Sequence, residues 1–185
     1  MDFLNQYELP ILHAINDFMQ CDVLDFFFSK ITVLGNGGIF WIILSVIMLI
    51  FKRTRLIGFS MAFSLIIGLL LCNLTLKPLV GRARPFAVDP SILENLLISK
   101  PSEFSFPSGH TVCSIESAVA FYLCNKKWGI VAIVIALLVA FSRIYLMVHY
   151  PTDIIGGIIL GTAIGFAGHA LAKLFIKLTK IPAAE

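Results

Sequence analysis

The chain has 185 residues, of which 58% are hydrophobic and only 14% are charged. Soluble domains usually carry about 25% charged residues, so the composition predicts a single all-α integral membrane domain over 1–185. The net charge of +3 provides no basic surface of the kind that binds nucleic acid, which excludes that class of function. The first twenty residues contain no Lys or Arg, and we therefore expect no secretory signal peptide.

The N-terminal segment, 1–20, mixes apolar and polar side chains over its whole length. Leu4 and Ile11 stand among Glu8 and Asp17. This mixture predicts a helix that lies in the membrane interface and does not cross the bilayer. A sixth crossing by this segment is the alternative.

Five later segments are predicted to span the membrane, since about 20 apolar residues cross its hydrocarbon core. These segments are 31–51, 56–76, 111–124, 128–147 and 154–176. A Gly-Asn-Gly-Gly run is expected to break the first span near its outer end. The third segment is short, and hydropathy alone leaves it doubtful.

The distribution of cations decides in favour of the third span. Eight cations form three groups, which are Lys52, Arg53 and Arg55, then Lys126 and Lys127, then Lys173, Lys177 and Lys180. The three groups lie on one side of the membrane if 111–124 crosses it, and the positive-inside rule makes that side cytoplasmic. The N-terminus and the long loop over 80–106 are then outside, and this loop is expected to carry part of a functional site.

Two features of the spans differ from the large apolar side chains that make up most of them. Glu116 is ionisable, and such a residue within a span is a functional candidate. We expect Glu116 to face the bundle interior, neutral or hydrogen-bonded, and to position a helix. Gly157, Gly161 and Gly165 recur every four residues, which predicts close helix packing without chemistry.

Residues that can bind phosphate gather at the outer ends of the spans under this topology. Lys77, Arg84 and Arg143 supply three positive charges, and both arginines can contact phosphate oxygens bidentately. Ser108 and Gly109 stand at a helix start, where Ser108 is a plausible cap and glycine lets backbone N–H groups approach an anion. Together these five residues predict a phosphate-binding site.

Two histidines and a carboxylate add the means for chemistry. His149 and Asp153 are four residues apart, with Pro151 between them as the expected first residue of a helix. Asp153 can accept a hydrogen bond from one ring nitrogen of His149, which leaves the other free to attack phosphorus. His110, on a different helix, is expected to protonate the leaving oxygen. No cluster of carboxylates or cysteines has metal-ligand spacing, so no metal or other cofactor is predicted.

These residues fall into three motifs. They are Lys77 with Arg84-Pro85, then Pro107-Ser108-Gly109-His110, then Ser142-Arg143 with His149 and Asp153. The set resembles the type 2 phosphatidic acid phosphatase family in residues, spacing and order. The resemblance implies a metal-independent phosphatase that forms a phosphohistidine on His149, with His110 as general acid. It also implies phosphate binding by Lys77, Arg84, Ser108, Gly109 and Arg143.

Family resemblance also guides the expected substrate, which is a lipid phosphate whose tail stays in the bilayer. The layout resembles bacterial undecaprenyl-diphosphate phosphatases of this family, so undecaprenyl diphosphate is the first choice. Phosphatidylglycerophosphate, phosphatidate and lipid A phosphates compete with it. We expect a multi-pass protein of a bacterial plasma membrane with an extracytoplasmic site. A lipid phosphotransferase and a transporter are the alternative classes. Soluble vanadium haloperoxidases share the motifs, but the apolar spans argue against them.

Three further polar residues have weaker interpretations. Arg82 lies between motif residues, where it either touches a phosphate or headgroup or belongs to a solvated loop. His13 and His169 have no partners at useful spacing in the sequence. We expect both to be structural or interfacial.

Overall fold

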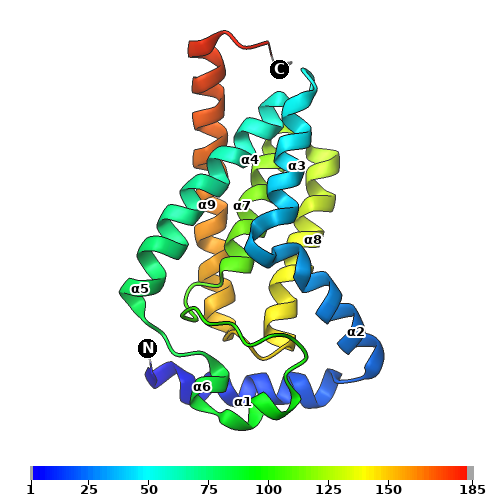
Figure 1. The fold of residues 1–185 in the computed structure, drawn as a ribbon, viewed down its shortest axis with the longest axis vertical. Coiled ribbons are helices and arrows are strands. Elements are labelled where there is room, and N and C mark those ends of the chain that lie inside the picture. Colours follow the sequence, from blue (N-terminus) through cyan, green and yellow to red (C-terminus); the bar gives the residue numbers. More distant parts are fainter. Residues whose placement is uncertain (1, 183–185) are drawn as a thin grey trace.

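The structure, a computed structural model, describes residues 2–182, and the secondary structure among them is entirely helical (Figure 1). In chain order the elements are α1 (Asp2–Met19), α2 (Asp22–Ile31), η1 (Thr32–Gly38), α3 (Ile39–Ile50), α4 (Arg55–Gly68), η2 (Leu69–Leu76), α5 (Lys77–Val80), α6 (Pro85–Val88), η3 (Pro90–Asn95), α7 (Gly109–Cys124), α8 (Lys126–Tyr145) and α9 (Pro151–Thr179). The predicted all-α class is confirmed.

Four helical stretches are long and apolar enough to cross a membrane, judged by length and composition. They are Asp22–Ile50, Arg55–Val88, Lys126–Tyr145 and Pro151–Thr179. The third predicted span, 111–124, corresponds to α7, whose 16 residues reach only about 24 Å against a hydrocarbon core of ~30 Å. By this criterion the prediction of five was one too many, although α7 still runs within the bundle, packed against α8 and α9. The chain is a multi-pass membrane protein.

The predicted break in the first span is confirmed at η1. Asn36 and Gly37 leave the helical backbone, and Gly37 and Gly38 have φ angles of 55° and 67°. Glycine adopts these left-handed angles without the steric cost that other residues meet. The helix direction changes here between α2 and α3 (Figure 1), and the break leaves Asn36 beside the N-terminus of α7, in contact with His110.

α7 forms the centre of the bundle, where α4, α8 and α9 pack around it. Gly161 and Gly165 of α9 face it closely. A Cβ added at Gly161 would lie 3.0 Å from Cβ of Ile115, and one added at Gly165 would lie 2.8 Å from Cβ of Val119. The glycines therefore allow the close approach that their spacing predicts, which fixes the N-terminal ends of α7 and α9 side by side.

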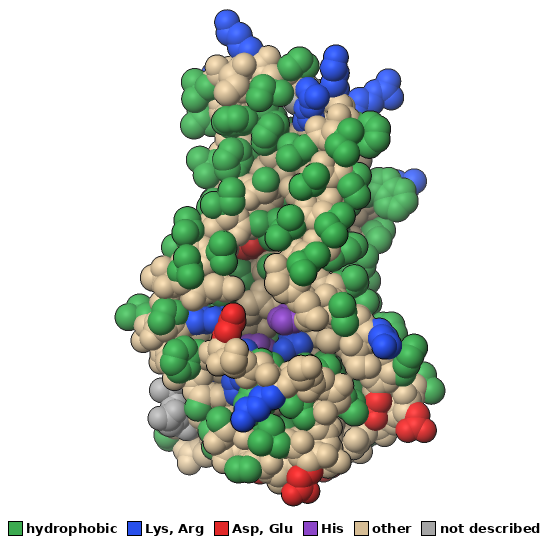
Figure 2. Space-filling view, viewed as in Figure 1, with side chains coloured by type: hydrophobic (Ala, Val, Ile, Leu, Met, Phe, Trp, Pro, Cys, Tyr) green, Lys and Arg blue, Asp and Glu red, His purple; other side chains and the backbone are tan. Residues whose placement is uncertain are grey.

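The two ends of the bundle differ in charge and in structure. Lys and Arg side chains gather at one end, and exposed apolar side chains cover the sides (Figure 2). At the other end α1 lies crosswise beneath the helices, close to α6 and η3 (Figure 1). Leu12 of α1 is fully buried and joins Phe28 and Tyr145 in an apolar cluster. α1 is not among the four stretches that could span, which agrees with the predicted interfacial helix and gives no support to a sixth crossing.

Candidate active site

A cavity of about 420 Å³ opens where the bundle meets the segment that connects α5 with α7. Figure 2 shows this hollow as a break in the apolar side of the molecule, with acidic, basic and histidine side chains inside it. Six of the eight predicted site residues line it, namely Lys77, Arg84, Gly109, His110, Arg143 and His149. The other two, Ser108 and Asp153, are buried behind them. Motif residues that are far apart in the sequence thus meet in one place.

His149 is held by contacts at both ring nitrogens. It lies between the end of α8 and Pro151, the first residue of α9. Its Nδ1 is 3.3 Å from Oδ2 of Asp153, and its Nε2 is 3.1 Å from a guanidinium nitrogen of Arg84. Because arginine can only donate, Nε2 must accept, and Nδ1 must therefore carry the proton toward Asp153. Burial lowers the pKa of His149 to about 3, although the hydrogen bond to Asp153 acts in the opposite direction. The imidazole is neutral at pH 7.

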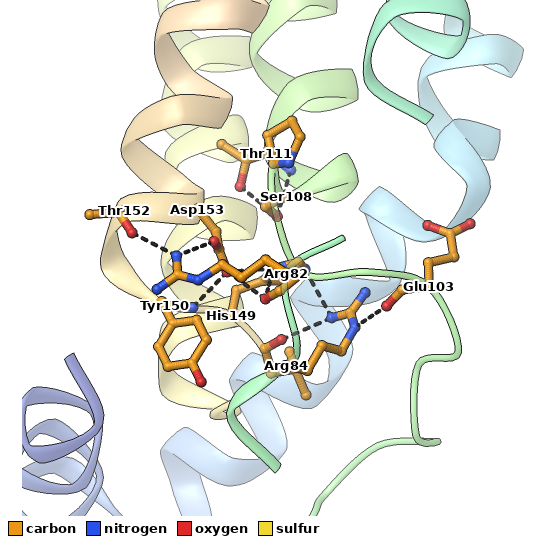
Figure 3. Close-up of polar contacts among 12 residues, drawn as sticks. Arg82, Arg84, Glu103, Ser108, Thr111, His149, Tyr150, Thr152 and Asp153 are labelled. Atoms are coloured by element: carbon orange, nitrogen blue, oxygen red, sulfur yellow. Dashed lines mark hydrogen bonds and ion pairs between the residues drawn. The ribbon is translucent and has the colours of Figure 1, made fainter. Parts of the chain in front are cut away.

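Asp153 is fixed from both of its carboxylate oxygens (Figure 3). Oδ2 accepts hydrogen bonds from the Ser105 hydroxyl at 2.5 Å and from the Tyr150 backbone N–H at 2.9 Å. Oδ1 accepts from Arg82 at 2.6 Å. The predicted pairing of Asp153 with His149 is therefore present within a wider network that the motifs do not reveal.

Arg82 connects this network to α1, and its interpretation as part of a solvated loop or as a headgroup contact was wrong. Its side chain is completely buried, so it belongs neither to a solvated loop nor to a surface that meets headgroups. Besides Asp153 it donates to Asn5 at 2.9 Å, to Glu8 at 2.5 Å and to Thr152 at 2.7 Å. The guanidinium also lies 3.9 Å from the ring centroid of Tyr150.

The three predicted phosphate-binding cations line the cavity from different elements. Arg84 donates to the backbone carbonyls of Glu103 at 2.6 Å and Val148 at 2.8 Å, which orient its guanidinium. Arg143 donates to Thr32 at 2.6 Å, while its buried Nε has no hydrogen-bond partner within residues 2–182. Lys77 forms an ion pair with the side chain of Glu103. Arg143 therefore keeps a donor for an anion, and Lys77 holds a carboxylate in place of one.

The N-terminus of α7 contributes the second motif. Ser108 is the N-cap, as expected, and its hydroxyl accepts from the backbone N–H of Thr111 at 3.4 Å. A Cβ added at Gly109 would lie 3.2 Å from Nζ of Lys77, so the absent side chain leaves room for this cation. Nε2 of His110 lies 2.8 Å from the amide oxygen of Asn36. This helix start thus faces the cavity beside two of the cations.

Several residues near the site carry no recognisable pattern in the sequence. Ser105, Glu103 and Asn36 come from loops or from the broken part of the first span, and only the folded chain brings them to the cavity.

His13 and His169 do not line the cavity. His13 contacts Asp89 at 2.9 Å, and Ser91 and His13 together hold the pKa of Asp89 below its usual value. Within residues 2–182 no group of three or more His, Cys, Asp or Glu side chains is arranged to hold a metal ion.

Comparison with known proteins agrees with the motifs. The model of the PAP2 superfamily matches residues 56–176. An undecaprenyl-diphosphatase of Sulfolobus acidocaldarius is 41% identical over 128 residues, which cover 68% of this chain and 60% of that protein. A lipid A 4'-phosphatase of Bacteroides thetaiotaomicron is 30% identical over 192 residues, covering 97% of this chain and 81% of that protein. The match thus spans about three fifths of the Sulfolobus relative and four fifths of the Bacteroides one.

Two solved structures share the fold over most of the chain. The crystal structure of a PAP2-type phosphatidylglycerolphosphate phosphatase from Bacillus subtilis superposes with a TM-score of 0.73 at 27% identity, covering 94% of this chain and 88% of that one. The crystal structure of LpxE from Aquifex aeolicus gives a TM-score of 0.68 at 26% identity, covering 88% of this chain and 94% of that one.

Proposed function

The chain belongs to the PAP2 superfamily, and we propose that it removes phosphate from a membrane lipid through a phosphohistidine on His149. The observation that carries this proposal is the neutral His149, fixed by Asp153 at Nδ1 and turned with Nε2 toward Arg84 and the cavity. A neutral imidazole held in one tautomer is a competent nucleophile. Residues 1–185 act as one domain in this proposal, because α1 and the loop over 80–106 both contribute to the network around Asp153.

Phosphate binding falls to the cations and to the start of α7. Lys77, Arg84 and Arg143 neutralise the phosphoryl oxygens, and the charge that develops in transfer is stabilised by groups already in position. Ser108 and Gly109 shape the helix start, whose backbone N–H groups and dipole favour an anion. The incoming phosphate replaces the Glu103 carboxylate at Lys77, since both anions need the same ammonium group.

The reaction has two steps. In the first, Nε2 of His149 forms a bond to phosphorus while the bond from phosphorus to the leaving oxygen breaks, and His110 gives that oxygen a proton. In the second, water gives a proton to His110 and attacks the phosphohistidine, the phosphorus–nitrogen bond breaks and inorganic phosphate leaves. With a diphosphate substrate the first leaving group is a lipid monophosphate. Asp153 stabilises the imidazolium-like charge on His149 during both steps.

Undecaprenyl diphosphate is the substrate we propose first, because of the similarity to the Sulfolobus protein. The cavity continues from the cations to apolar residues of α3, α4 and η2, including Ile42, Leu65 and Leu69, which suits a hydrocarbon chain. Phosphatidylglycerophosphate, phosphatidate and lipid A phosphates compete, because proteins named for related lipids are also similar.

The site faces the extracytoplasmic side of a bacterial plasma membrane in this proposal. Eight cations belong to the connections and the terminus at the opposite end of the bundle, and the positive-inside rule assigns that end to the cytoplasm. In this orientation the enzyme has access to lipid phosphates of the outer leaflet.

Phosphate release by the purified protein in detergent tests the function. Undecaprenyl diphosphate, phosphatidylglycerophosphate and phosphatidate would be offered in parallel, with EDTA present. We expect hydrolysis of at least one lipid, undiminished by EDTA, and a loss of about 10⁴-fold or more in the His149→Ala variant. A His149→Ala protein that is folded and fully active would refute the phosphohistidine. Wild-type protein that is folded and inactive on all three lipids, and on a lipid A phosphate offered in the same way, would refute the phosphatase assignment.

A further inference from the structure

Glu116 lines the cavity at a distance from the groups that bind phosphate. It lies on α7 six residues after His110, which corresponds to about 9 Å along the helix axis. Its side chain is 1% exposed, and its Oε2 atom has no hydrogen-bond partner within residues 2–182. The walls beside it include Leu65, Leu69 and Val112, none of which has a polar side chain.

The surrounding helices make room for this carboxyl. Gly68, the last residue of α4, lies against the Glu116 carboxyl, and a side chain at this position would meet the carboxyl oxygens where they now lie. η2, which follows at once, is a π-helix, a rare form that often marks functional sites. Asn73 of η2 lines the same cavity one turn before Lys77. Polar groups thus continue from the cations into the membrane-embedded part of the cavity.

A purely structural role does not account for Glu116. The sequence predicted a carboxyl that is neutral or hydrogen-bonded and that positions a helix, but Oε2 has no hydrogen-bond partner within residues 2–182. A buried polar atom without a hydrogen bond is costly, and within a membrane the cost is larger because water is scarce. A side chain of this kind, facing a cavity next to a binding site, has the chemistry of a ligand contact.

We infer that the deep end of the cavity is a hydroxyl-binding subsite, in which Glu116 hydrogen-bonds to a hydroxyl of the lipid substrate. This inference rests on the proposed function and adds a contact that selects among lipid phosphates. The favoured substrates carry a hydroxyl between the phosphate and the hydrocarbon tails, as in a glycerol or sugar headgroup. A polyprenyl diphosphate, which is proposed first above on similarity to a relative, has only hydrocarbon to offer at this depth. The subsite would therefore favour the glycerol and sugar lipids that compete with it.

A hydroxyl fits this position better than an ammonium group. It both donates and accepts, so it satisfies the carboxyl in either protonation state. An ammonium group would have to leave water entirely and pass Lys77, Arg84 and Arg143, which carry the same charge. Such a site also discriminates strongly against a lipid that lacks the hydroxyl, because Glu116 would then stay unpaired.

A pair of matched lipids tests the subsite. Purified protein would be offered phosphatidylglycerophosphate and an analogue in which hydrogen replaces the free hydroxyl of the headgroup glycerol. We expect kcat/KM to favour the hydroxyl-bearing lipid by about tenfold or more in the wild type. In Glu116→Leu, which fills the same space without a polar group, the ratio should fall to about one. Glu116→Gln, which can still donate and accept, should restore most of the preference.

Ser117→Ala is the matched control, because Ser117 is the next residue on α7, equally buried, and does not line the cavity. This variant should keep the wild-type ratio. Equal turnover of the two lipids by the wild type, or an unchanged ratio in Glu116→Leu, would overturn the subsite. Turnover of undecaprenyl diphosphate without turnover of either glycerol lipid would also overturn it, while the phosphatase proposal stands. A folded protein that hydrolyses none of these lipids and no lipid A phosphate would refute the function, and the subsite with it.

Discussion

His149 combines two properties that a surface histidine cannot have together. Its ring is almost completely buried, yet both nitrogens meet a polar group, Asp153 on one side and Arg84 on the other. Burial disfavours the protonated ring, and Arg84, which can only donate, keeps Nε2 without a proton. The position of His149 therefore favours the neutral ring, as the proposed role of nucleophile requires.

The pH dependence of catalysis follows from this arrangement. Because burial lowers the pKa of His149 to about 3, the neutral form persists as the pH falls from 8 to about 4. We therefore expect that protonation of His149 causes no fall in kcat/KM near pH 6.5, the usual pKa of histidine. Initial rates across pH 4–8 would measure it. An acid limb near pH 6.5 that moves when Asp153 is replaced by Asn would contradict the prediction.

The motifs predicted eight candidate site residues, and the structure places six of them at the cavity and two, Ser108 and Asp153, buried behind them. The residues that hold these side chains in place could not be predicted from the sequence. Ser105 binds Asp153 from a loop without any pattern, and Glu103 reaches Lys77 from the same loop. Arg82 was misread, because its partners Asn5 and Glu8 come from a helix more than seventy residues earlier. Spacing along one segment predicts local geometry, whereas these contacts depend on how distant segments fold together.

At the scale of elements, Arg82 joins three parts of the chain that the sequence presents separately. Its guanidinium connects α1 with the start of α9 from the segment after α5. Glu8 of α1 reinforces the junction by accepting from the backbone N–H of Thr152 at 2.8 Å and from its hydroxyl at 2.9 Å. The interfacial helix α1 is thus tied to the carboxylate that contacts His149, the proposed nucleophile. We regard Arg82 as a positioning residue, since it acts on His149 only through Asp153.

Replacement of Arg82 should lower turnover more than substrate binding. In Arg82→Gln we expect kcat to fall at least tenfold with KM changed less than threefold, because the phosphate-binding cations remain in place. Arg82→Lys keeps the charge but loses the forked donors, so it should recover only part of the rate. Steady-state kinetics on the preferred lipid would measure both variants.

Lys100→Gln is the control, because Lys100 is an exposed cation in the same segment between α5 and α7. It should match the wild type. Loss of a partner in a buried ion pair can also destabilise the fold, so thermal unfolding would be recorded for each variant. Glu8→Gln, which keeps an acceptor for Arg82, should show a smaller loss of kcat. A rise in KM with unchanged kcat in Arg82→Gln would assign Arg82 to phosphate binding and contradict the positioning role.

Helix existence was easier to predict than helix ends. The apolar runs gave the main helices, and the glycines of η1 gave the break between α2 and α3. α2 itself was not foreseen, because the expected span began at residue 31 and α2 already ends there. α7 runs through the bundle in the direction that the distribution of cations requires, but it is shorter than a full membrane span. Its burial at the centre of the bundle relaxes that requirement, since neighbouring helices cover a helix that need not meet lipid along its whole surface.

For the whole molecule, the orientation in the membrane is predicted by counting the cations on each connection between spans. The structure puts α1 and the segment between α5 and α7 at one end of the bundle, and most of the lysines and arginines at the other (Figures 1 and 2). Nothing about the cavity enters this count, so the orientation and the chemistry are independent predictions.

Cysteine labelling in intact bacterial cells would test the orientation. Cys21 is exposed between α1 and α2, and the neighbouring Asp25 accepts a hydrogen bond from Tyr145 at the end of α8 that is nearer the site. In a variant that keeps only this native cysteine, with Cys72, Cys113 and Cys124 replaced by alanine, a membrane-impermeant maleimide should label Cys21 without permeabilisation.

The matched variant carries Lys127→Cys in place of Cys21, since Lys127 is exposed at the start of α8 and belongs to a cationic group. α8 has 20 residues and extends about 30 Å, so the two labelled positions differ by a full bilayer core. The new cysteine should react only after the cells are opened. Labelling of Lys127→Cys from outside, with Cys21 protected, would reverse the orientation and place the phosphate site toward the cytoplasm. Equal labelling of both in sealed cells would mean that the chain inserts in two orientations, a result that the strong bias of its cations argues against.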